Sequence, residues 1–136
     1  MIKVSKLQRS NILSAKKMWN SVPEANVMPY LLNWRSFSDE HKNLSPTCNT
    51  IACFGGWCAY WPKFQAQGLY GGNGGGPVFY GNDSMYETSA HLFGCSNMFV
   101  SRGFNNSDMG SDPATSDWQV VMDRIDHLIQ NSTVTL

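Results

Sequence analysis

The sequence has no long apolar run, no excess of charge of either sign and no internal repeat. No stretch approaches the roughly 20 apolar residues that a membrane-spanning helix needs, so we expect no membrane association. Ten Lys and Arg residues balance ten Asp and Glu residues, and a dedicated nucleic-acid-binding domain is therefore not expected. The basic residues cluster only near the N-terminus, at Lys3, Lys6, Arg9, Lys16 and Lys17.

Residues 1–19 also lack the apolar core of a secretory signal peptide, because charged side chains are scattered through them. We therefore expect a cytoplasmic protein. Thiols stay reduced in that compartment, so the four cysteines are interpreted as free thiols rather than as a disulfide framework.

Apolar volume, by contrast, is plentiful. Of the 136 residues, 42% are hydrophobic, and five Trp, seven Phe and seven Met supply the material for a core. This hydrophobicity and the balanced charge exclude a disordered chain. A chain of this length fits one domain. Because the apolar spacing is helical in several segments, we expect a mainly α fold, a compact single-domain helical bundle over residues 1–136.

Helical spacing is clearest near the two ends of the chain. The first helix is predicted over Ser5–Asn20, and the last begins at Asp112-Pro113 or at Ser116. In the first helix, the residues expected to face inward are Leu7, Ile12, Leu13, Met18 and Trp19. In the last, we expect a buried stripe of Trp118, Val121, Met122, Ile125, Leu128 and Ile129, and a solvent side of Asp117, Asp123, Arg124 and Asp126. A shorter helix is predicted over Ser84–Phe93, with Gly94 as its left-handed terminal residue.

The strongest local pattern is an apolar run that follows Pro46 and is closed by Pro62. It predicts a central buried helix over about residues 47–61, because the run is apolar on nearly all sides. Gly55 and Gly56 each disfavour a helix by about 1 kcal/mol relative to Ala, so we expect another element to pack closely against them.

The remaining segments are ambiguous or rich in polar residues and glycine. Val27–Phe37 holds large apolar side chains interrupted by Pro29, and periodicity does not decide between a helix and an extended segment. A flexible glycine-rich loop that contains a short extended segment near 78–80 is predicted over residues 68–81. Residues 105–113 predict a second mobile loop.

Cys48 is the candidate for chemistry. A thiol at a helix N-terminus lies at the positive end of the helix dipole, which lowers its pKa and favours the thiolate. A histidine brought close by the fold would complete a Cys–His nucleophile pair, and His91 is the preferred partner over His41 and His127. The alternative is an inert Cys48, because free Cys is among the most buried residue types and no thiol-enzyme signature surrounds it.

Metal and phosphate sites are not expected. Cys48, Cys53 and Cys58 are five residues apart, so successive thiols on one helix point roughly 140° apart and do not converge on one ion. The loop Gly71–Gly76 lacks the Lys-Ser/Thr pair of a Walker loop, and no βαβ unit surrounds it. We therefore predict neither a metal nor a cofactor.

The segment CNTIACFGGWCA, Cys48–Ala59, resembles the motif C-G-T-x-A-C-x-[AG]-G-[WH]-A of small bacterial and bacteriophage proteins of unknown function. The segments Ala90–Ser96 and Val121–Ile125 look like two further parts of the same pattern, whereas Asn49 and Cys58 depart from it. The resemblance implies a mostly helical, phage-type accessory protein, located in the host cytoplasm if a phage encodes it. It transfers no catalytic residue.

These observations predict a non-enzymatic accessory protein that acts by binding a host or phage macromolecule, with a protein as the expected partner. Aromatic residues dominate binding hot spots, and those beyond the needs of the core are Tyr30, Trp61, Tyr70, Phe79 and Tyr80. The alternative is a small thiol-dependent enzyme or sensor that uses Cys48 with His91. The sequence leaves the identity of the partner and the oligomeric state open.

Overall fold

The computed structural model describes residues 1–22, 54–59, 61–71, 77–79, 85–100, 105, 108, 112 and 114–135. In this part of the chain five helices outweigh four short strands, which confirms the expected mainly α fold. The predictions for Val27–Phe37, for Cys48 and for residues 72–76 of the glycine-rich loop lie outside the described residues.

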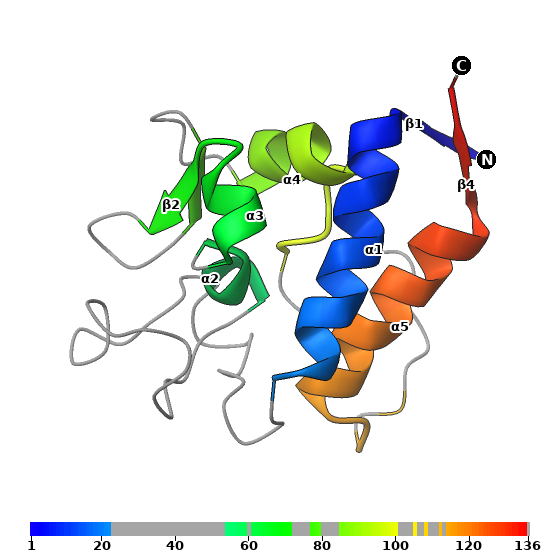
Figure 1. Ribbon diagram of the computed structural model, residues 1–136. Coiled ribbons are helices and arrows are strands. Elements are labelled where there is room, and N and C mark those ends of the chain that lie inside the picture. The colour runs from blue at the N-terminus through cyan, green and yellow to red at the C-terminus, as the bar shows by residue number, and fades with distance from the viewer. Residues whose placement is uncertain are drawn as a thin grey trace.

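Two long helices, α1 (Lys6–Asn20) and α5 (Asp117–Gln130), lie side by side in the structure (Figure 1). Each begins after a serine whose hydroxyl accepts a backbone N–H that the helix itself does not satisfy. Ser5 forms a capping box with Gln8, in which Ser5 Oγ accepts from the Gln8 N–H at 3.1 Å and Gln8 Oε1 accepts from the Ser5 N–H at 2.8 Å. Ser116 Oγ accepts from the Gln119 N–H at 3.2 Å, so Ser116 rather than Asp112 begins α5.

Polar contacts join α1 and α5 at both ends. At one end, Trp19 Nε1 donates to the Trp118 carbonyl at 2.9 Å, and Trp118 Nε1 donates to the Trp19 carbonyl at 3.1 Å. At the other, the Arg9 guanidinium donates to the carbonyl of Ile129 at 3.3 Å and to that of Ser132 at 3.0 Å. A cation there also complements the negative end of the α5 dipole.

The two ends of the described chain form a parallel strand pair, β1 (Ile2–Val4) with β4 (Ser132–Val134), that the sequence did not predict. Ile2 lies opposite Ser132, and Val4 lies opposite Val134. The N- and C-termini therefore lie close together at one edge of the molecule (Figure 1).

The described part of the predicted central helix is shorter than residues 47–61. Helix α2 spans Phe54–Ala59, and Pro62 does not close it but begins a separate short helix, α3 (Pro62–Gln65). Trp61 has extended backbone angles (φ −86°, ψ 124°), which is the conformation that a following proline favours. Proline suits the first helical position because its missing N–H has no helical acceptor there.

Burial of α2 agrees with its predicted central place. The ring of Phe54 contacts those of Trp19, Phe93 and Phe99 at centroid distances of 5.3, 6.1 and 5.7 Å. Cys58 is fully buried as well, so this thiol is part of the core.

The ends of the predicted glycine-rich loop are paired strands. Strand β2 (Leu69–Gly71) runs antiparallel to β3 (Pro77–Phe79), so residues 69–71 and 77–79 of the predicted loop form a strand pair. The extended segment expected near residues 78–80 is confirmed for Val78 and Phe79 and begins at Pro77.

Helix α4 (Met85–Phe93) ends as predicted at Gly94, which has a positive φ of 73°. The Gly94 N–H donates to the Ala90 carbonyl at 2.9 Å. A Cβ at this position would lie 2.7 Å from Val4 Cγ1 and 3.0 Å from Gln8 Oε1, so glycine is required both by the backbone and by the close approach of α1 and β1.

Candidate functional site

Of the predicted Cys–His pair, the structure describes His91. This histidine is exposed in the last turn of α4, where it lines an open depression of about 280 Å³ together with Gln8, Glu87 and Ala90. Cys48 lies outside the described residues, so its pairing with His91 stays a prediction.

The five aromatic residues proposed as a binding patch are only partly described. Tyr70 on β2 is 47% exposed, whereas Trp61 is half-buried and packs against the core. Phe79 lies in β3, and its side chain falls outside the described part, as do Tyr30 and Tyr80. Among the described members, Tyr70 alone is an exposed surface aromatic.

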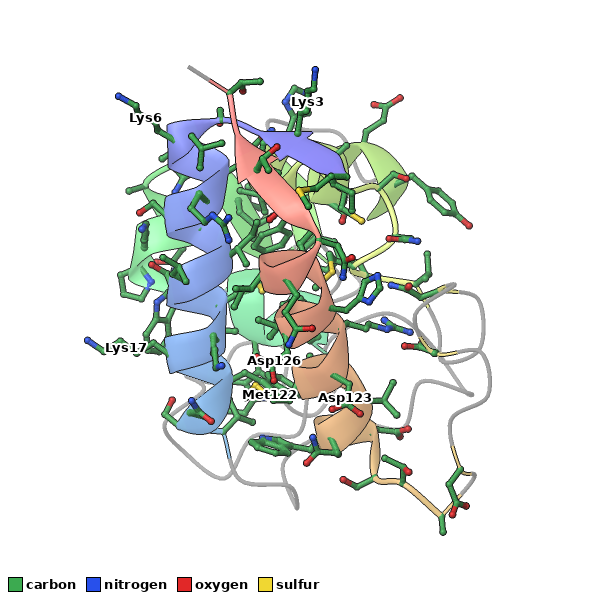
Figure 2. All side chains as sticks on the ribbon, turned by 90° about the vertical axis from the view of Figure 1, so that its right-hand side faces the viewer. Lys3, Lys6, Lys17, Met122, Asp123 and Asp126 are labelled. Atoms are coloured by element: carbon green, nitrogen blue, oxygen red, sulfur yellow. The ribbon has the colours of Figure 1, made fainter. Side chains whose placement is uncertain are left out.

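The solvent side of α1 carries positive charge. Helix α1 contains no acidic residue, and Lys6 and Lys17 project from the same side of it, away from α5 (Figure 2). Leu13 is seven residues after Lys6 and four before Lys17, so helical periodicity places it on this side too. The prediction that Leu7 and Leu13 face inward is wrong: they are 56% and 50% exposed.

Helix α3 adds a third lysine to this surface. Lys63 Nζ donates to Ser10 Oγ at 2.5 Å and to Ser14 Oγ at 2.8 Å, which fixes its ammonium group against α1. Ser10 is four residues after Lys6 and therefore lies beside it on the helix. We call the surface formed by Lys6, Ser10, Leu13, Lys17 and Lys63 the lysine face.

The remaining cations of α1 are used within the molecule. Lys16 forms an ion pair with Asp126 of α5 at 2.7 Å, and Arg9 binds the carbonyls of Ile129 in α5 and Ser132 in β4. Lys6 and Lys17 have no acidic partner among the described residues. Asp123 lies on α5, away from Lys6 and Lys17 (Figure 2), and Asp126 is paired with Lys16. Among the described residues, the lysines of α1 that face solvent are therefore separated from the acids of α5, although the net charge is zero.

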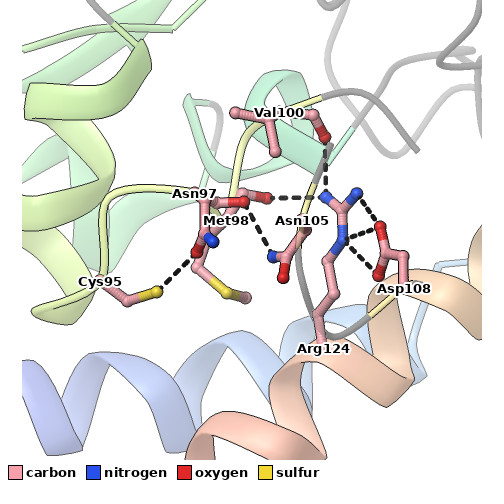
Figure 3. A network of polar contacts seen from close by, with 7 residues as sticks. All are labelled: Cys95, Asn97, Met98, Val100, Asn105, Asp108 and Arg124. Carbon is pink, nitrogen blue, oxygen red and sulfur yellow. Dashed lines mark hydrogen bonds and ion pairs between the residues drawn. The ribbon is translucent and has the colours of Figure 1, made fainter. Parts of the chain in front are cut away.

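Arg124 contradicts its predicted solvent position. Its side chain is fully buried, and it forms a bidentate ion pair with the buried carboxylate of Asp108 (Figure 3). The same guanidinium donates to the Val100 carbonyl at 2.8 Å and to the Met98 carbonyl at 3.3 Å. We call this arrangement the arginine clasp, because it holds Met98, Val100 and Asp108 against α5.

A sequence signal for this burial existed. Arg124 is four residues after Val120 and four before Leu128, both of which are buried, so all three share one side of α5. Of residues 105–113, predicted as a second mobile loop, the described members Asn105 and Asp108 are buried and hydrogen-bonded, whereas Asp112 is exposed. The mobility of this segment stays a prediction.

A cavity of about 190 Å³ lies beside the arginine clasp. One part of its lining is apolar and comes from Ile2, Met98 and Leu128. The polar part of its lining consists of Cys95, Asn97, Asn105, Arg124 and His127.

The polar wall of the cavity is held together by its own contacts (Figure 3). Asn105 Nδ2 donates to the Asn97 carbonyl at 3.0 Å, and the Cys95 thiol contacts Asn97 Oδ1. Upstream, the buried Ser89 hydroxyl binds the Cys95 carbonyl and accepts from the Met98 N–H at 3.0 Å, which fixes the turn that carries these residues.

The described part of the chain contains no cluster of potential metal ligands. No three His, Cys, Asp or Glu side chains lie close enough there to hold an ion. The two described cysteines, Cys58 and Cys95, are free thiols.

Comparison with known proteins identifies no relative. No family model, no curated protein and no solved structure matches the chain. The resemblance of Cys48–Ala59 to small phage proteins stays a prediction. Within the described ranges, no helix has the length and apolarity needed to cross a membrane.

Proposed function

We propose that this protein is a non-enzymatic accessory protein that binds an acidic protein partner through the lysine face of α1. The observation that carries the proposal is the segregation of charge: Lys6 and Lys17 project to solvent from a helix that contains no acid. Charges of one sign gathered on one face steer partners of the opposite sign, even when the net charge of the molecule is zero.

The mixed chemistry of the face favours a protein over a nucleic acid. A duplex-binding surface makes about 6–10 phosphate contacts. The lysine face offers Lys6, Lys17 and Lys63, of which Lys63 already binds two serine hydroxyls. Leu13 lies between Lys6 and Lys17 with half of its surface exposed, and a protein can bury that apolar side chain whereas a phosphate backbone cannot.

The resemblance of Cys48–Ala59 to phage proteins suggests where the partner comes from. We expect a bacterial host protein or another phage protein with an acidic, partly apolar surface. This origin is a proposal that rests on the sequence motif, whereas the lysine face rests on geometry.

The proposal is tested with a pair of variants that change the net charge equally. In Lys6→Gln/Lys17→Gln, two charges are removed from the lysine face; in Ser96→Glu/Gln130→Glu, two negative charges are added at exposed sites elsewhere. Proteins retained by the immobilised wild type from bacterial and phage-infected lysates are identified, and the affinity of each purified candidate is then measured for all three chains.

Two exposed ion pairs of up to about 1 kcal/mol each predict roughly tenfold weaker binding for Lys6→Gln/Lys17→Gln and little change for the control. Equal affinities of the two variants would show that the lysine face does not bind the partner. Retention of nucleic acid in place of an acidic protein would contradict the assigned partner class.

A further inference from the structure

The cavity beside the arginine clasp lies on the side of α5 that carries Arg124 and His127, whereas the lysine face lies on α1. Its volume of about 190 Å³ exceeds the ~150 Å³ of an engineered apolar cavity that admits benzene. The space is therefore sufficient for a single-ring molecule. Unlike that apolar cavity, this one is lined partly by side-chain amides, a thiol and an imidazole.

Two of the residues that line the cavity, Asn97 and His127, each carry a hydrogen-bond donor with no partner among the described residues. Asn97 uses its carbonyl and Oδ1 within the polar wall, which leaves the Nδ2 group to donate. Asn131 Nδ2 contacts His127 Nδ1 at 3.3 Å, and since an amide nitrogen only donates, Nδ1 is the acceptor. When Nδ1 accepts, the ring proton lies on Nε2, which is then a donor. A ligand that satisfies both groups must offer acceptors.

The charged group in the described part of the lining is compensated. Arg124 lines the cavity, and its guanidinium is neutralised by Asp108 and donates to two carbonyls. A carboxylate ligand would lose its hydration without gaining an unpaired cation, which is unfavourable. The site therefore favours an uncharged ligand over an anion of the same shape.

The walls are also held in place before a ligand arrives. The arginine clasp fixes the carbonyls of Met98 and Val100. The hydrogen bond from Asn105 to the Asn97 carbonyl fixes the turn that carries Asn97. Preorganised walls lower the entropy that binding would otherwise cost. Ile2, Met98 and Leu128 supply an apolar surface for the edge of a ring.

We propose that this cavity is a binding site for a small, uncharged, single-ring molecule that carries a carbonyl group, of the carboxamide or lactam class. Asn97 Nδ2 and His127 Nε2 donate to its acceptors, and the apolar wall covers its ring. This site is independent of the lysine face, so a result that disproves one of the two proposals leaves the other intact.

Nicotinamide is a suitable probe because it combines one ring, a neutral carbonyl and a second acceptor. Nicotinate has the same shape with a negative charge, and toluene has the ring without acceptors. Each probe is titrated into the full-length protein while backbone amide signals are followed by NMR. We expect nicotinamide to bind with a dissociation constant of about millimolar, as its size implies, and to shift signals around Cys95–Met98 and His127.

The variants are His127→Phe, Asn97→Leu and, as a matched control, His91→Phe on α4. His127 and His91 are both exposed, so either phenylalanine is expected to preserve the fold. Loss of one neutral hydrogen bond predicts about three- to tenfold weaker nicotinamide binding in His127→Phe and in Asn97→Leu, and no change in His91→Phe.

The outcomes separate the possibilities. Tighter binding of nicotinamide than of nicotinate and toluene, weakened by both site variants, supports the proposal. Toluene binding as tight as nicotinamide binding would mean a merely apolar cavity, and the absence of shifts at millimolar nicotinamide would mean no site; either result overturns the proposal. Equal losses in His127→Phe and His91→Phe would overturn the role of His127.

Discussion

At the scale of single residues, Arg124 is a buried cation on α5 that binds groups outside its own helix. Its partners are Asp108 and the carbonyls of Met98 and Val100. A buried guanidinium is tolerated only when its donors are satisfied. The position of Asp108 is therefore tied to that of α5.

Asp108→Ala is predicted to destabilise the protein by about 3–5 kcal/mol, because it leaves a buried, uncompensated guanidinium. Urea denaturation at equilibrium measures this loss. Asp123→Ala provides the control, since Asp123 is exposed on α5 and accepts only a surface hydrogen bond from Gln119. That control should change stability by less than about 0.5 kcal/mol.

A double variant separates burial of charge from loss of packing. Replacing both partners, in Asp108→Leu/Arg124→Met, removes the unpaired charge, and stability is predicted to recover most of what Asp108→Ala loses. A double variant as unstable as the single one would contradict the role assigned to the ion pair.

At the scale of elements, the sequence predicts helices well and strand pairs poorly. The boundaries of α1 and α5 follow from serine caps and apolar spacing, and Gly94 marks the end of α4. Pro62 is predicted to close the central helix, but it begins α3 instead, since proline both follows one helix and suits the first position of the next. The β1–β4 pair was missed because its three-residue strands lie at opposite ends of the chain and offer no local pattern.

Gly94→Ala tests the junction of α4 with α1 and β1. An alanine would lie in a left-handed conformation that costs about 1–2 kcal/mol, and its Cβ would also clash with Val4 Cγ1, so we expect a loss of at least that size. Thermal and urea unfolding measure it, with the exposed Ser96→Ala as the control. Stability within about 0.5 kcal/mol of the wild type would show that this junction is looser than described.

At the scale of the whole molecule, a chain without net charge nonetheless presents a basic helix face. The sequence shows the cluster of lysines near the N-terminus, but it does not show which of these side chains bind other parts of the molecule. Arg9 and Lys16 bind groups within the molecule, and Lys63 joins the lysine face from α3, far along the sequence. Only the folded structure therefore distinguishes the basic side chains that face solvent from those with a role inside the molecule. The cavity is likewise visible only in the folded structure, because its lining comes from β1, α5 and the turn after α4.

The most direct test of the central claim is site-specific photo-crosslinking from the lysine face. A benzophenone amino acid replaces Leu13 in one protein and Asp123 of α5 in another, and both are irradiated in lysate at low and at high salt. We expect a covalent adduct with an acidic protein from position 13 at low salt, a weaker one at high salt, and none from position 123. An adduct that forms only from position 123, or one from position 13 that consists of nucleic acid, would contradict it.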